Sequence, residues 1–97
     1  MKIQLISFRG CPNVGNARRA LRQALASLDL EETFEEVDSA AHDTPDDLRF
    51  WGSPTVLING VDVAGGTPSG ASCRMYPPSE FPGAPPLAMI VRRLSGT

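Results

Sequence analysis

The side chain in this sequence with the clearest chemical potential is the thiol of Cys11. It follows an apolar stretch, residues 2–8, and precedes Pro12, a residue favoured in the first helical turn because the N–H that it lacks is not needed there. A thiol at a helix N-terminus lies near unpaired N–H groups and the positive end of the helix dipole, which favour the reactive thiolate. We therefore predict a reactive Cys11; the alternative is a buried cysteine that acts as a small apolar side chain.

Cys73 is the second cysteine, and it lies in a loop rich in proline and glycine, residues 64–86. If this loop folds back toward Cys11, the two thiols could form a disulfide, or together hold a soft metal ion such as mercury, arsenic or copper. The sequence leaves open whether they meet. No four-ligand zinc spacing is present, and His42 stands in a polar stretch that predicts an exposed residue, so we assign no metal ligands.

Charged residues are unevenly distributed along the chain. Nine of the eleven acidic residues fall within residues 29–47, which is typical of a solvated face. Several arginines come close to Cys11 in the sequence, and they would favour its thiolate if the fold also brings them close. They are Arg9, Arg18, Arg19 and Arg22.

The apolar pattern predicts the elements that must position these side chains. Residues 2–8 are predicted to form a central strand, because both alternating faces carry apolar residues. Apolar residues spaced by three or four predict an amphipathic helix over residues 14–28, and the Asn59-Gly60 dipeptide predicts a hairpin. The other expected elements are strands at 32–37, 55–58 and 61–63, a short helix through residue 49 or 50 with Pro45 in its first turn and Asp43 or Thr44 as its cap, and a last helix that Pro86 opens. Trp51 is expected to pack against the sheet.

This order, β-α-β-α-β-β-α, resembles the thioredoxin fold and is closest to its glutaredoxin-like members. The matching motifs are Cys11-Pro12 at the first strand-to-helix turn and Gly52-Ser53-Pro54-Thr55-Val56 at the start of the third strand. The resemblance covers residues 1–63 and, more loosely, the last helix. Small bacterial thioredoxin-like proteins that carry a Ser-Cys-Arg-X-Tyr segment, here residues 72–76, are the most similar. The resemblance implies one α/β domain over residues 1–97, a three-layer sandwich with a four-stranded mixed sheet.

The resemblance also implies roles for particular residues. Cys11 would be the nucleophile of a thiol–disulfide oxidoreductase, with Pro12 and Asn13 shaping the helix start. Pro54 would follow a cis peptide bond, and the backbone of Ser53, together with Pro54 and Thr55, would bind an extended peptide or glutathione. The partners implied are thiol or disulfide substrates, glutathione or a protein among them, with no resident cofactor.

Val14 stands where redox members of that family carry the second cysteine of a Cys-X-X-Cys motif. Three alternatives follow. Cys11 could act alone through a mixed disulfide with glutathione, Cys73 could replace the missing thiol, or the redox function could be lost, which would leave a non-catalytic interaction module.

Size and composition exclude several other classes. The chain has 97 residues and a net charge of −2, so we expect one domain and no nucleic-acid partner. No apolar run approaches the roughly 20 residues that cross a bilayer. The N-terminal residues lack the apolar stretch of a secretory signal. We therefore expect a cytoplasmic protein, monomeric or weakly dimeric, that does not contact a membrane.

Overall fold

The computed structural model describes residues 1–70 and 72–96, and these build a four-stranded sheet with three helices. The elements in chain order are β1 (Ile3–Ser7), α1 (Val14–Ser27), β2 (Glu35–Asp38), α2 (Asp46–Arg49), β3 (Thr55–Ile58), β4 (Val61–Asp62) and α3 (Leu87–Ser95). The strand order across the sheet is β2-β1-β3-β4. Strands β1 and β2 are parallel, whereas β3 is antiparallel to both β1 and β4. The predicted α/β class and four-stranded mixed sheet are therefore confirmed.

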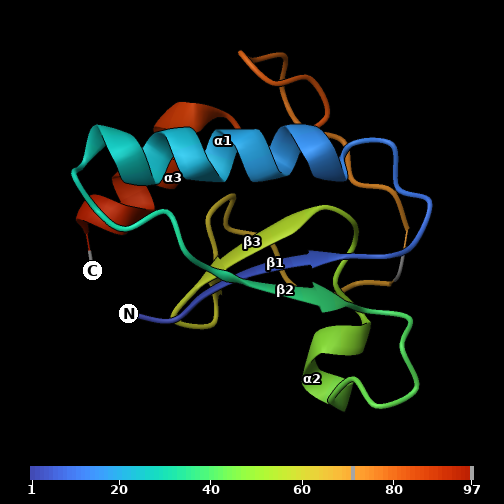
Figure 1. Cartoon of the computed structure of the whole chain (residues 1–97). Coiled ribbons are helices and arrows are strands. Elements are labelled where there is room, and N and C mark those ends of the chain that lie inside the picture. Colours follow the sequence, from blue (N-terminus) through green and yellow to red (C-terminus); the bar gives the residue numbers. More distant parts are fainter. Residues whose placement is uncertain (71, 97) are drawn as a thin grey trace.

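Helices cover both faces of the sheet. α1 and α3 lie together on one face, and α2 lies on the other (Figure 1). β1 is a central strand, and Gln4, Leu5 and Ile6 in its middle are buried, as the two-faced apolar pattern predicts. No helix in the described part of the chain is both long and apolar enough to cross a membrane.

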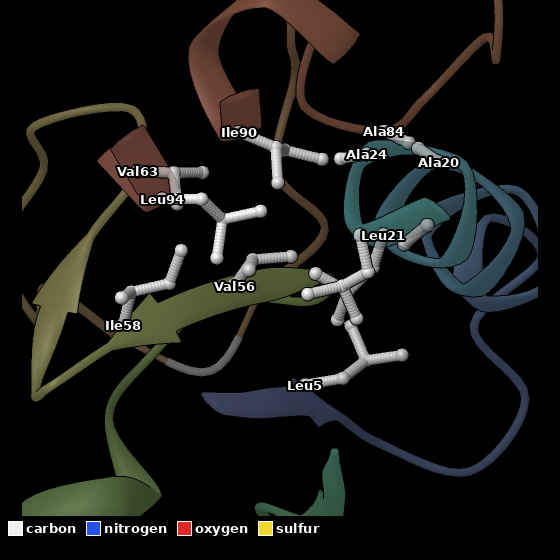
Figure 2. Close-up of a cluster of buried hydrophobic side chains, with 12 residues drawn as sticks. Leu5, Ala20, Leu21, Ala24, Val56, Ile58, Val63, Ala84, Ile90 and Leu94 are labelled. Atoms are coloured by element: carbon white, nitrogen blue, oxygen red, sulfur yellow. The ribbon is translucent and has the colours of Figure 1, made fainter. Parts of the chain in front are cut away.

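The main core fills the space between α1, α3 and the sheet (Figure 2). The buried face of α1 carries alanines and leucines, and Leu21 is fully buried among side chains of β1 and β3 such as Leu5 and Val56. Ile90 and Leu94 bring α3 into the same cluster. A second cluster, on the α2 face, contains Ile6, Leu57 and Trp51, and this confirms the expected packing of Trp51 against the sheet.

Two local predictions need correction. α2 begins at Asp46, one residue after Pro45, and no side chain caps it. The Thr44 hydroxyl instead donates a hydrogen bond to the carbonyl of Asp38, at 2.5 Å, so it ties the loop to the end of β2. β2 is also shorter than predicted and begins at Glu35. The Asn59-Gly60 turn is confirmed, with φ of 52° and 81° at its two residues.

Candidate functional site

The turn between β1 and α1 holds Cys11 just ahead of the helix. α1 begins at Val14 and Asn13 is its N-cap residue, so Pro12 lies before the helix and not in its first turn. The helix starts at Val14, as the apolar spacing predicted, and the Asn13 carbonyl accepts its first hydrogen bond, from the N–H of Ala17 at 3.0 Å. The Cys11 N–H donates to the carbonyl of Phe8 at 3.2 Å, which closes the turn.

Cys11 itself is 6% exposed. It is buried but is not among the described residues that form either apolar cluster.

The arginines near Cys11 in the sequence are directed mostly to other partners. Arg18 holds Glu36 of β2 through two hydrogen bonds of 2.9 and 2.7 Å, and this contact lowers the pKa of Glu36. Arg19 donates to the Asn16 side chain at 2.8 Å. Arg22 lies over the ring of Phe34, 5.9 Å from its centre. Three of the four arginines that lie close to Cys11 in the sequence therefore contact other side chains.

The loop that leads into β3 lies against the Cys11 turn. The peptide bond between Ser53 and Pro54 is cis, as the resemblance implied. Ser53 is fully buried, and its hydroxyl accepts a hydrogen bond from the N–H of Phe8 at 3.4 Å. Thr55 is buried as well, and its hydroxyl donates to the carbonyl of Gly52 at 2.6 Å. Ser53 therefore connects the loop to the turn that carries Cys11.

Residues 72–76, which we call the strap, pair with this loop. The Ser53 N–H donates to the carbonyl of Ser72 at 2.9 Å, and the Arg74 N–H donates to the carbonyl of Ser53 at 2.9 Å. These two bonds form a parallel bridge between Ser53 and Cys73. In Figure 1 the strap lies at the end of the sheet where β1 leads into α1. In this structure the strap therefore occupies both backbone groups of Ser53 that the resemblance assigned to a substrate.

Arg74 anchors the strap to the sheet. Its Nη1 atom lies 2.9 Å from Oδ2 of Asp62, in β4, and 3.0 Å from the hydroxyl of Thr55. The carboxylate of Asp62 is fully buried and also accepts hydrogen bonds from the N–H groups of Ala64, at 3.2 Å, and Gly66, at 2.8 Å. These partners offset the cost of burying the charge, and the loss of any one of them would leave a buried charged or polar group unpaired.

Tyr76 completes the strap. Its ring stacks on the Arg74 guanidinium, 4.8 Å from ring centre to the guanidinium carbon, and its hydroxyl donates to the carbonyl of Pro54 at 2.5 Å. Sequence reasoning did not identify Asp62, Arg74 or Tyr76 as site residues. The Ser-Cys-Arg-X-Tyr spacing was the signal for the last two, because it places the cationic and aromatic side chains two residues apart, where one cation–π contact can form.

The environment of Tyr76 predicts how the free energy of unfolding depends on pH. Burial raises the pKa of its phenol well above the ordinary value of about 10, although the positive charge of Arg74 opposes the shift. Above about pH 10 the unfolded chain loses this proton while the folded chain keeps it, so the free energy of unfolding should fall as pH rises. We expect Tyr76→Phe to reduce that fall, as measured by urea unfolding at several pH values.

Ultraviolet absorbance gives an independent check, because Tyr76 is the single tyrosine of the chain. Phenolate should appear together with the loss of helical circular dichroism. Full ionisation near pH 10 in a protein that remains folded would contradict the prediction.

The other predicted site residues are distributed as follows. Asn13 packs against Gly83, where an added methyl group would overlap its side chain. Pro12 and His42 are exposed, as is Cys73. Both cysteines are free thiols. Within residues 1–70 and 72–96, no three His, Cys, Asp or Glu side chains come together to hold a metal ion.

No protein-family model, curated protein or solved structure significantly matches the chain. What the protein does must therefore be inferred from its own residues. Ser53 connects the two segments that carry the cysteines. Its hydroxyl accepts a hydrogen bond from the turn that carries Cys11, and its backbone pairs with Cys73.

Proposed function

We propose that the domain has a thioredoxin-like fold. Supporting this is the β2-β1-β3-β4 strand order, with β1 and β2 parallel and β3 and β4 antiparallel to their neighbours. The placement of α1 and α3 on one face and α2 on the other agrees with it (Figure 1). So does the chain path, which puts Cys11 after β1 and Ser53-Pro54 immediately before β3.

On this scaffold we propose a thiol–disulfide oxidoreductase in which Cys11 is the nucleophile and Cys73 is the resolving thiol. The observation that carries the proposal is the backbone pairing of Cys73 with Ser53, next to the Cys11 turn. Cys73 then supplies the second thiol that Val14 does not provide. Thiolates exchange with disulfides through a mixed-disulfide intermediate, so a second thiol that reaches Cys11 can release a bound substrate.

The Cys11 thiolate attacks one sulfur of a substrate disulfide, the substrate S–S bond breaks, and the first substrate thiolate leaves and takes a proton from water. The Cys73 thiolate then attacks Sγ of Cys11, which releases the second substrate thiol and leaves a Cys11–Cys73 disulfide. Two electrons have passed to the substrate. Two molecules of a small thiol such as glutathione restore both cysteines and leave as its disulfide.

The neighbouring residues would have supporting roles. Pro12 and Asn13 set the path of the chain from the Cys11 turn into α1. Ser53, Pro54 and Thr55 hold the strap through their backbone and hydroxyl groups, so in this conformation they position Cys73. An extended peptide would use the Ser53 backbone only after displacing the strap.

The proposal predicts the products of oxidation by glutathione disulfide, measured by acid quenching and mass spectrometry. We expect the reduced wild-type chain to form a Cys11–Cys73 disulfide without accumulating a glutathione adduct, because Cys73 resolves the mixed disulfide. Cys73→Ser should instead accumulate an adduct at Cys11, and Cys11→Ser should form no intramolecular disulfide.

Two outcomes would contradict it. A wild-type chain that accumulates only the Cys11 adduct would favour the monothiol alternative, in which Cys73 has no role. A Cys11 that remains unmodified, in a protein shown by circular dichroism to be folded, would favour the non-catalytic interaction module.

A further inference from the structure

Arg74 connects the strap to strands β3 and β4 of the sheet. Its guanidinium is bound by Asp62 and Thr55 at 2.9 and 3.0 Å, and its own N–H is bound by Ser53 at 2.9 Å. The residue before it in the chain is Cys73. Backbone and side chain of Arg74 together therefore determine where Cys73 lies relative to Ser53.

Two glycines leave room for this side chain. A methyl group on Gly52 would overlap the Cγ atom of Arg74 and lie 2.9 Å from the carbonyl oxygen of Ser72. A methyl group on Gly66 would lie 2.8 Å from Oδ2 of Asp62 and 3.0 Å from Nη2 of Arg74. Contacts this short require the neighbouring atoms to move, so a larger residue at either position would disturb the anchored strap.

We infer that Arg74 is a positioning residue for Cys73, which keeps the resolving thiol beside the Cys11 turn. This inference rests on the proposed function. Cys73 belongs to a loop rich in proline and glycine, and Cys11 lies far from it in the sequence. Without an anchor, a flexible loop of this length gives each thiol only a low effective concentration near the other, because closing the loop costs entropy. Anchoring the loop in the reduced protein removes much of that entropic cost.

An arginine suits this task better than a lysine. Its planar guanidinium donates in several fixed directions, so one group can bind a carboxylate and a hydroxyl while its face stacks on the ring of Tyr76. A lysine would keep the positive charge next to Asp62 but would lose the fixed donor directions of the guanidinium and its stacking on Tyr76. Arg74→Lys therefore separates charge from geometry.

The test is the equilibrium constant for forming the Cys11–Cys73 disulfide in glutathione redox buffers, measured on variants that circular dichroism shows to be folded. We expect Arg74→Gln to lower this constant about tenfold or more, a shift of about 30 mV or more toward a less negative potential. Arg74→Lys should recover part of the loss. Gly52→Ala should lower the constant in the same direction while leaving every charge and thiol in place.

Two matched controls accompany these variants. Arg92→Gln removes an exposed arginine from α3, and Gly15→Ala adds a methyl group in α1 whose nearest neighbour is 4.0 Å away. Both should keep the wild-type constant within about twofold.

Different results would overturn different claims. The positioning role is overturned if folded Arg74→Gln keeps the wild-type equilibrium constant. If that variant does not fold, the role is overturned when folded Gly52→Ala and Arg74→Lys both keep the constant. Either result leaves the proposed function intact. The positioning role is also overturned if all three variants fail to fold, since Arg74 then supports the whole domain. Absence of the disulfide in the wild-type chain overturns the proposed function instead.

Discussion

Replacing Asp62 with asparagine is expected to lower the free energy of unfolding by about 3 kcal/mol. The carboxylate is fully buried and accepts hydrogen bonds from Arg74, Ala64 and Gly66. An amide of the same shape keeps one acceptor oxygen but turns an N–H donor toward another donor. It also leaves the largely buried guanidinium without its counter-charge. Urea unfolding followed by circular dichroism measures the loss.

Asp47→Asn is the matched control, because Asp47 is exposed in the first turn of α2. Its effect should stay within about 0.5 kcal/mol. A loss below about 1 kcal/mol for Asp62→Asn would contradict the prediction and would mean that water or a shifted strap satisfies the buried groups.

The second large effect is expected in the main core. Leu21→Ala should lower the free energy of unfolding by about 2–5 kcal/mol, because it removes a fully buried side chain and leaves a cavity between α1 and the sheet. A domain of this size has about 5–15 kcal/mol of stability in total, so this change alone can bring it close to unfolding. The measurement is again the urea midpoint and slope.

Leu30→Ala provides the comparison, since Leu30 is 37% exposed and follows the end of α1. The same chemical change there should cost much less than at Leu21. Equal losses at the two positions would be inconsistent with the core as described.

The scaffold was largely predictable from local patterns. The three-and-four spacing in α1, the Asn59-Gly60 turn and the apolar run of β3 each agree with the structure, because their side-chain periodicity and turn chemistry act over only a few residues. Element boundaries were less accurate. Pro12 shows why: proline suits a first helical turn, but the helix starts only where the first carbonyl meets its donor, here the Asn13 carbonyl, and the residue type does not report that position.

The strap was not predictable in the same way. The Ser53–Cys73 bridge joins residues that are far apart in the sequence. It forms through backbone groups, which every residue carries, so the side-chain pattern does not indicate it. The prolines and glycines around it predicted a loop and gave no partner for it. Asp62 was missed for a related reason. Alternation in β4 would favour burying the valines on either side of it, yet Val61 is 45% exposed and Asp62 is 1% exposed. The buried carboxylate is explained by Arg74, which arrives from another segment, together with the N–H groups of Ala64 and Gly66.

The two edges of the sheet also determine how one molecule meets another. β4 has two residues, too few to template a long pairing with a second chain. β2, at the opposite edge, has four residues, and Glu35, Glu36 and Asp38 are exposed. A neighbouring strand aligned there would meet the carboxylates of Glu35 and Asp38 and the Arg18–Glu36 ion pair, and charged side chains of this kind protect sheet edges from pairing with other chains. The acidic segment therefore contributes to colloidal stability as well as to solvation.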